Sequence, residues 1–264
     1  MIIAAGDIAS CVSEGDEATA LLVQAISGTV ITMGDNAYDN GTAEQFNGCY
    51  DPSWGQFKDR TRPSPGNHDY LVPAAAGYFD YFGAAAGELG KGYYSYDLGA
   101  WHLIAINSMC WEVGGCGAES PQAVWLAADL AAHPVACTLA YWHHPRFSSG
   151  LHGNLDLMQT LWDVLYAGGA DVVLNGHDHV YERFAPQDPQ GAADPARGIR
   201  EIIAGTGGRS LYPFAGPARP NSEVRSASTY GVLKMTLHAD SYDWEFVPVA
   251  GETFTDSGTG ECHP

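Results

Sequence analysis

Six short apolar runs recur along the chain, and each ends in small or polar residues. They are MIIAAGD, GTVITMGDN, RPSPGNHD, WHLIAINS, CTLAYWHH and ADVVLNGHD. Uninterrupted apolar runs of this length are typical of strands that are covered on both faces. The sequence therefore predicts a buried sheet, so the chain must supply helices or a second sheet to cover it.

Helical patterns lie between several of these runs, and we predict helices at residues 16–26, 119–132 and 154–167. Ser120 fits the N-cap of the second helix, and Pro121 fits its first turn. Strands that alternate with helices indicate an α/β protein. Beyond residue 199, REIIAGTG, YGVLKMTLHA and YDWEFVPV resemble strands without intervening helices, which predicts a second, largely antiparallel sheet or sheet edge. Two stacked sheets flanked by helices accommodate both halves.

Length and charge limit the possible classes of function. With 264 residues the chain can bury a full core, and we expect one domain over residues 1–264. Its 12 Lys and Arg against 31 Asp and Glu give a formal net charge of −19, which disfavours nucleic acid and anionic membranes as partners. The longest apolar stretches are too short to span a bilayer. An anionic substrate would need local attraction, which points to metal ions.

The cysteines predict disulfide bonds. The six are Cys11, Cys49, Cys110, Cys116, Cys137 and Cys262, and no two form a CxxC pair, which argues against zinc-ribbon and thioredoxin-like folds. We predict a bond between Cys110 and Cys116 across the short loop CWEVGGC, and the other four allow three pairings. Disulfides favour a secreted or periplasmic protein, with six reduced core cysteines as the alternative. No signal peptide is visible in this numbering, because MIIAAGD already reads as a strand.

Polar side chains follow five of the predicted strands. They are Asp7; then Asp35, Asn36 and Tyr38; then Asn67, His68 and Asp69; then His143 and His144; then His177 and His179. Ligands of α/β proteins gather at the carboxyl ends of strands, and imidazole and carboxylate groups are common metal ligands. The sequence therefore predicts a metal site at these strand ends.

The motifs GD, GDNAY, GNHD, HHP and GHDH, in this order over residues 6–179, resemble those of the calcineurin-like metallophosphoesterases. More narrowly, they resemble the purple acid phosphatase branch. Most of the wider superfamily opens with Asp-x-His, whereas Asp7 is followed by Ile8 and Ala9, and Tyr38 stands three residues after Asp35 as in that branch. The resemblance implies a four-layer α/β/β/α sandwich of two mixed sheets flanked by helices.

The resemblance also implies two metal ions that share Asp35. It implies Fe(III) at Asp7, Asp35, Tyr38 and His179, and a divalent Zn, Mn or Fe at Asp35, Asn67, His143 and His177. A phenolate and carboxylates are hard donors that suit trivalent iron, and an amide with two imidazoles suits a divalent ion. These cations carry more charge than Asp7, Asp35 and an ionised Tyr38 neutralise, so the centre attracts phosphate despite the acidic surface.

The activity implied by the resemblance is hydrolysis of a small phosphorylated substrate, a phosphomonoester, by attack of a metal-bound hydroxide. His68 is then the general acid, and Asp69 is expected to orient its ring. His143 fits the family's His-x-Pro pattern as a ligand, which leaves His144 to face the substrate. Two alternatives stay open: a phosphodiesterase or nucleotide polyphosphate hydrolase with the same site, and a metal- or phosphate-binding protein without catalysis.

Other polar residues near these motifs allow two interpretations. Arg146 fits a structural salt bridge at least as well as a phosphate contact. Tyr70, His152, Tyr181 and Arg183 fit packing and pocket roles equally, whereas His102, His133, His238 and His263 have no site context and are expected to be structural.

Overall fold

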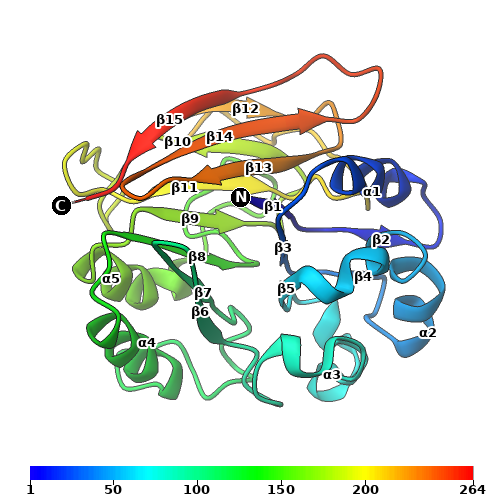
Figure 1. The fold of residues 1–264 in the computed structure, drawn as a ribbon, viewed down its shortest axis with the longest axis horizontal. Helices are drawn as coiled ribbons and strands as arrows, with labels where there is room; N and C mark the ends of the chain where they lie inside the picture. Colours follow the sequence, from blue (N-terminus) through cyan, green and yellow to red (C-terminus); the bar gives the residue numbers. More distant parts are fainter. Residues whose placement is uncertain (264) are drawn as a thin grey trace.

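The structure is a computed structural model that describes residues 1–263, in which two mixed sheets lie face to face between two groups of helices (Figure 1). The six-stranded sheet has the order β15 (Ser257–Glu261), β14 (Ser241–Pro248), β13 (Gly231–Leu237), β1 (Ile2–Ala5), β3 (Thr29–Met33) and β5 (Thr61–Ser64). The seven-stranded sheet has the order β12 (Ser222–Ser226), β10 (Tyr181–Phe184), β11 (Arg200–Ala204), β9 (Val172–Asn175), β8 (Cys137–Trp142), β7 (Trp101–Ala105) and β6 (Tyr94–Leu98). A short parallel pair joins β2 (Ala9–Ser10) to β4 (Ala37–Tyr38).

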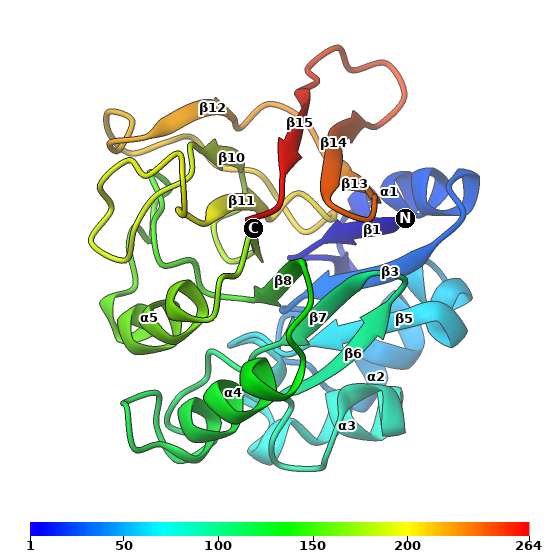
Figure 2. The same ribbon diagram turned by 60° about the vertical axis from the view of Figure 1, so that its left-hand side comes forward.

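The seven-stranded sheet has a parallel centre and antiparallel edges, whereas the six-stranded sheet is parallel in one half and antiparallel in the other. Strands β1, β3 and β5 are parallel, and β13, β14 and β15 extend this sheet from β1 in antiparallel steps. In the other sheet β7, β8, β9 and β11 are parallel, while β6, β10 and β12 are antiparallel; Figure 2 shows β6 beside β7. The predicted antiparallel pairing is confirmed for YGVLKMTLHA and YDWEFVPV, which form β13 and β14. REIIAGTG instead forms β11 in the other sheet, where it pairs in parallel with β9. Local patterns do not encode which strand pairs with which, because pairing partners are distant in sequence.

The helices cover the two outer faces (Figure 1). On the six-stranded sheet lie α1 (Gly15–Ala25), α2 (Ala43–Gln45) and α3 (Ala76–Phe82), with the short helical turns η1 (Phe46–Tyr50), η2 (Trp54–Arg60), η3 (Asp69–Leu71), η4 (Pro73–Ala75) and η5 (Gly83–Ala86). On the seven-stranded sheet lie α4 (Pro121–Ala132), the turn η6 (Asp156–Met158) and α5 (Gln159–Ala167).

Two of the three helix predictions agree closely with the structure, and the third started too early. The hydroxyl of Ser120 accepts a hydrogen bond from the backbone N–H of Ala123, which caps α4 as expected. Helix α5 begins only at Gln159. Asn154 and Leu155 instead bond to the preceding loop, since the side chain of Asn154 accepts from the Ser148 N–H and the Leu155 N–H donates to Pro145.

Three apolar layers separate the sheets and helices. Alternate residues of a strand point to opposite faces, so Ile2 and Ala4 pack between the sheets while Ile3 packs against the helices around α1. In β8, Leu139 faces the other sheet and Ala140 faces α4 and α5. The order of layers is helix, sheet, sheet, helix, which confirms the expected sandwich.

Three disulfides are present: Cys11–Cys49, Cys110–Cys116 and Cys137–Cys262. The predicted bond of Cys110 with Cys116 is confirmed. Cys137 begins β8 and Cys262 follows β15, so their bond joins the two sheets. Among residues 1–263, no helix has both the length and the apolar composition that a membrane crossing requires.

Candidate metal centre

The polar residues at the strand ends have an unusual backbone. Asp7 follows β1, Asp35 follows β3 and His177 follows β9, and their φ angles are 60°, 50° and 71°. Residues other than glycine rarely adopt a positive φ angle. Those that do are often found at functional sites, where a particular geometry is required. The three turns therefore place their side chains at a cost to the local backbone.

The glycines of the motifs allow the strand ends to approach one another. A Cβ atom on Gly34, whose φ is +78°, would lie 2.6 Å from the ring of His143. A Cβ atom on Gly176 would lie 2.7 Å from Oδ2 of Asp7. Each glycine thus provides space for a polar residue of a different strand, which explains why it precedes its motif.

The first group of ligand atoms surrounds the hydroxyl of Tyr38. This oxygen lies 2.8 Å from Oδ1 of Asp7, 3.0 Å from Oδ2 of Asp35 and 3.2 Å from Nε2 of His179. Nε2 of His179 is also 3.2 Å from Oδ1 of Asp7. One phenolic proton cannot satisfy three acceptors at once, so the arrangement favours a cation among these atoms.

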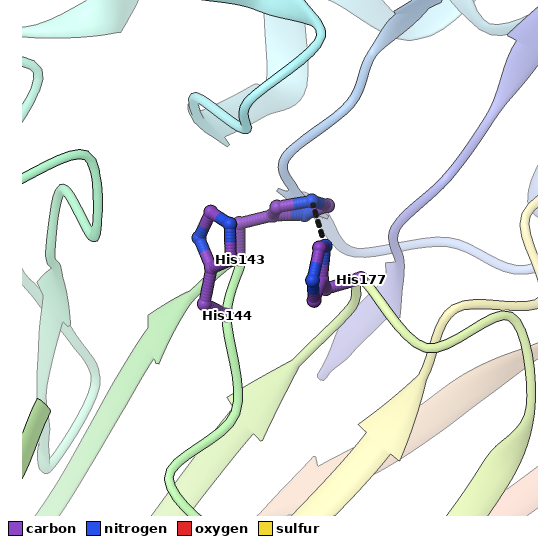
Figure 3. A group of neighbouring side chains, drawn as sticks. All are labelled: His143, His144 and His177. Atoms are coloured by element: carbon purple, nitrogen blue, oxygen red, sulfur yellow. Dashed lines mark hydrogen bonds between the residues drawn. The ribbon is translucent and has the colours of Figure 1, made fainter. Parts of the chain in front are cut away.

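The second group surrounds Nε2 of His143. Nδ1 of this ring lies 2.8 Å from the backbone oxygen of Met33, and a carbonyl only accepts, so Nδ1 carries hydrogen. Nε2 lies 3.1 Å from Oδ1 of Asn67, 3.2 Å from Oδ2 of Asp35 and 3.2 Å from Nδ1 of His177. Figure 3 shows the facing rings of His143 and His177. In a neutral His143 these atoms present converging lone pairs, which again favours a cation.

Asp35 belongs to both groups through the same oxygen. Burial raises its pKa, but the neighbouring His143 and His68 outweigh burial and lower the pKa overall. Burial lowers the pKa of His143, and the carboxylate of Asp35 reverses this effect and raises it to about 9. Burial, followed by the charges of Asp35 and Asp7, raises the pKa of Tyr38 well above its usual value.

His68 lies at the entrance of the centre, with a third of its side chain exposed. Its Nδ1 is 2.5 Å from the backbone oxygen of Asp39, and its ring is 4.5 Å from the ring of Tyr38. The carboxylate of Asp69 instead accepts hydrogen bonds from the side chain and backbone of Asn36 and from the N–H of Gly66. The expectation that Asp69 orients the ring is corrected: the Asp39 carbonyl does so, because the short turn after Asn67 directs Asp69 into the core.

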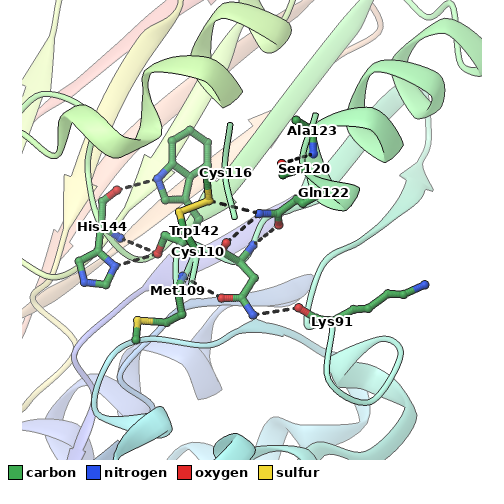
Figure 4. Close-up of a disulfide and its surroundings, with 11 residues drawn as sticks. Lys91, Met109, Cys110, Cys116, Ser120, Gln122, Ala123, Trp142 and His144 are labelled. Atoms are coloured by element: carbon green, nitrogen blue, oxygen red, sulfur yellow. Dashed lines mark hydrogen bonds between the residues drawn. A yellow bond between two sulfur atoms is a disulfide. The ribbon is translucent and has the colours of Figure 1, made fainter. Parts of the chain in front are cut away.

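His144 lies beside the two groups and is braced by a loop. Nδ1 of His144 is 2.8 Å from the hydroxyl of Ser108, and its ring lies 4.2 Å from the ring of His177. Burial and the neighbouring His143 lower the pKa of His144 to about 3. Ser108 precedes the loop closed by Cys110 and Cys116, which lies beside His144 in Figure 4.

Two further side chains adjoin the centre. The ring of His152 lies 4.3 Å from that of His177, so this histidine belongs near the centre. Tyr212 stacks on His179 at 4.6 Å and donates a hydrogen bond to the backbone oxygen of His177. Tyr212 lies in the long loop over residues 205–221, and no sequence pattern separated it from the chain's other tyrosines.

Three buried carboxylates hold the loop that carries His143, His144 and His152. Glu201 accepts hydrogen bonds from the N–H groups of Arg146 and Phe147, and Glu182 accepts one from Ser149. Asp178 accepts one from the His152 N–H at 2.9 Å. These roles were not predictable from the sequence, because each carboxylate lies at least 26 residues from its partner and carries no local signal.

The remaining polar residues have structural partners. Arg146 pairs with Asp156 and also bonds Gln159, as the structural interpretation expects. Tyr181 and Arg183 both bond the carboxylate of Asp256, and Tyr70 accepts from Asn107. The four histidines that were expected to be structural also have acidic partners. His102 pairs with Asp97 and Asp129, and His133 pairs with Asp129. His238 pairs with Asp243, and His263 pairs with Asp171.

Three sets of side chains in residues 1–263 bring ligand atoms within 4.8 Å of one another. Two of these sets overlap at the strand ends: Asp7, Asp35 and His143; and His143, His144 and His177. The third set comprises Asp97, His102 and His133, and both ring nitrogens of His102 already bond carboxylates. The strand ends therefore offer the better candidate for a metal centre.

The sequence is similar to a known family and to several curated phosphatases. Residues 1–181 match the family model described as calcineurin-like phosphoesterase. Purple acid phosphatase 21 of Arabidopsis thaliana is 31% identical over 190 residues, which cover 65% of this chain and 42% of that protein. Acid phosphatase type 7 of Homo sapiens is 29% identical over 254 residues, covering 81% of this chain and 56% of that protein. The chain thus spans roughly half or less of the length of these relatives.

A solved structure shares the fold. The purple acid phosphatase PPD1 from seeds of yellow lupin (Lupinus luteus) superimposes with a TM-score of 0.77 at 18% identity, covering 99% of this chain and 53% of that chain. The chain therefore belongs to the calcineurin-like phosphoesterase family, and within it to the purple acid phosphatase-like branch.

Proposed function

We propose that this chain hydrolyses phosphomonoesters with two cations held at the two groups of ligand atoms. The main support is the convergence of lone pairs around Tyr38 and around His143, with Oδ2 of Asp35 common to both. Asp7, Asp35, Tyr38 and His179 would hold Fe(III), because phenolate and carboxylate oxygens are hard donors. Asp35, Asn67, His143 and His177 would hold divalent Zn, Mn or Fe.

The two cations would supply Lewis acidity that activates water and neutralises charge on the phosphoryl group. The chain itself provides the proton for the leaving alkoxide. Nδ1 of His68 faces the Asp39 carbonyl and keeps its hydrogen, which leaves Nε2 as the atom that holds the mobile proton. The hydroxyl of Ser108 can donate to Nδ1 of His144, which places a hydrogen on Nε2 of that ring, where it can bond a phosphate oxygen.

Replacing His68 by alanine tests the proton donor. We expect kcat for an alkyl phosphate to fall by about a hundredfold or more, the usual contribution of general acid catalysis. The loss should be much smaller for p-nitrophenyl phosphate, whose leaving group is stable without a proton. Metal content, measured by mass spectrometry, should not change. Equal losses for both substrates would rule out His68 as the proton donor.

Replacing Tyr38 by phenylalanine tests the identity of the first cation. A phenolate bound to Fe(III) gives a visible charge-transfer colour, and we expect iron-loaded protein to lose that colour in Tyr38→Phe. The absorption spectrum and the iron content should be measured on the same sample. Protein that stays coloured and iron-loaded after this substitution would contradict the assignment of Tyr38 as a ligand.

The substrate class needs its own experiment, because paired cations also suit phosphodiesters and nucleotide polyphosphates. Metal-loaded protein should be assayed with p-nitrophenyl phosphate and bis-p-nitrophenyl phosphate. We expect the monoester to be the better substrate. A preference for the diester would favour the phosphodiesterase alternative. Inertness toward both with full metal content would favour a binding protein.

We also propose that residues 1–264 fold as one domain and that the protein acts in an oxidising compartment, secreted or periplasmic. The shared apolar layer between the two sheets supports a single folding unit. The three disulfides support the compartment, because reducing compartments keep thiols reduced.

A further inference from the structure

A cavity of about 510 Å³ is linked to the candidate metal centre through one of its lining residues, His152. Its walls come from two loops, residues 149–153 and residues 215–220. His152 is part of the first wall, and its ring packs 4.3 Å from His177. His152 therefore contacts both this cavity and a proposed metal ligand.

Arg219 is the cationic residue among those that line the cavity. Its backbone N–H donates to the hydroxyl of Ser149 at 2.8 Å, and its Nε donates to the backbone oxygen of Ser148 at 3.3 Å. These bonds tie the two walls together and fix the plane of the guanidinium group. Nη2 lies 3.5 Å from the position of a Cβ atom on Gly153, the residue after His152.

The terminal nitrogens of Arg219 have no protein partner within residues 1–263: no carboxylate pairs with them, and no hydrogen bond engages them. By contrast, Arg146 and Arg209 are each paired with an aspartate. In a chain of formal net charge −19, an unpaired guanidinium beside the centre creates a local site for an anion. A guanidinium with two free terminal nitrogens matches the oxygens of a phosphate.

We propose that Arg219 and this cavity form a subsite for a second phosphate group on the substrate. The proposal rests on the proposed function, because the first phosphate must occupy the metal centre. The acidic surface would otherwise repel a doubly phosphorylated substrate more strongly than a monophosphate. Arg219 offsets that repulsion on the side of the centre where His152 lines the cavity. Arg219 is therefore a specificity-determining residue.

The test compares matched substrates in metal-loaded protein. Alkanediol bisphosphates of increasing chain length are assayed beside alkyl monophosphates of the same lengths, by release of inorganic phosphate. We expect a lower KM for a bisphosphate long enough to reach Arg219 than for its monophosphate. Arg219→Gln should raise that KM by about tenfold, the loss of one charge-assisted hydrogen bond at a solvent-exposed position. KM for the monophosphates and both kcat values should stay unchanged.

Two variants control for charge and folding. Arg219→Lys keeps the positive charge and should retain part of the preference. Arg197→Gln removes an exposed arginine that stacks on Tyr166 instead, and should alter neither KM. Equal KM values for bisphosphates and monophosphates in the native chain, or an equal rise for both in Arg219→Gln, would overturn the subsite.

Failure of the proposed function has a different signature from failure of the subsite. If metal-loaded native protein hydrolyses no phosphate ester, the activity is wrong, and calorimetric binding of the same bisphosphates to native protein and Arg219→Gln then decides on the subsite. Tighter bisphosphate binding that disappears in the variant would support it. Identical affinities would overturn it.

Discussion

Replacing Asp35 by asparagine is expected to abolish phosphomonoester hydrolysis, with kcat lowered on the order of a thousandfold or more. Its Oδ2 lies 3.0 Å from the Tyr38 hydroxyl and 3.2 Å from Nε2 of His143, so one oxygen serves both groups of ligand atoms. Asparagine removes the negative charge common to both positions, and cations at such centres contribute several kcal/mol of transition-state stabilisation. Metal content should fall at both positions together, which mass spectrometry on dialysed protein measures.

A matched control is Asp163→Asn, which makes the same change at an exposed position on α5. This variant should keep its metal content and its kcat. Folding of both variants should be followed by circular dichroism, since Oδ1 of Asp35 also accepts the His68 N–H at 2.8 Å. A folded Asp35→Asn protein with two cations and native kcat would show that Asp35 does not connect the two positions.

The strand ends were predictable because the candidate ligands follow strand-like runs. Four of these runs end in a glycine that directly precedes a candidate ligand, which is Asp7, Asp35, Asn67 or His177. Asp7 and Asp35 could be placed at the same end of one sheet, because ligands gather at the carboxyl ends of parallel strands. His177 follows β9 of the other sheet, so its approach to them depends on how the two sheets stack. The close approach of Gly34, after β3, to His143, after β8, shows that the strand ends of the two sheets meet. Where a ligand packs closely against another strand end, that strand end requires a glycine. Such a glycine is visible in the sequence next to the motif.

The residues that support the ligands have no comparable pattern in the sequence. Glu201 and Asp178 act through backbone N–H groups of a loop that is distant in sequence, and any residue in that loop offers an N–H group. Asp69 was misread for the opposite reason. Its position next to His68 suggested contact, but the turn directs its carboxylate toward Asn36 and Gly66. Adjacency in sequence is thus a poor guide to contact where the backbone turns sharply.

The disulfide from Cys137 to Cys262 is expected to contribute the most to stability of the three. The two cysteines are 125 residues apart, and the chain-entropy relation gives about 5 kcal/mol for closing a loop of that length. Cys110 and Cys116 are 6 residues apart, for which the same relation gives about 2 kcal/mol. Urea unfolding of the two double alanine variants should therefore show a much larger fall in the free energy of unfolding for Cys137→Ala with Cys262→Ala.

The loss of activity in the two variants should have the opposite order. The short disulfide closes the loop next to Ser108, and Ser108 contacts His144. Under conditions where both variants are folded, removing Cys110–Cys116 should lower kcat/KM, whereas removing Cys137–Cys262 should leave it near the native value. The Cys137–Cys262 disulfide closes a long loop, so it mainly restricts the unfolded chain. The Cys110–Cys116 disulfide instead holds the loop beside Ser108 and so affects the position of the His144 side chain in the folded state. Two results would contradict this division between a stabilising and a positioning disulfide. One is a larger fall in the free energy of unfolding for the Cys110–Cys116 variant, and the other is a larger fall in kcat/KM for the Cys137–Cys262 variant.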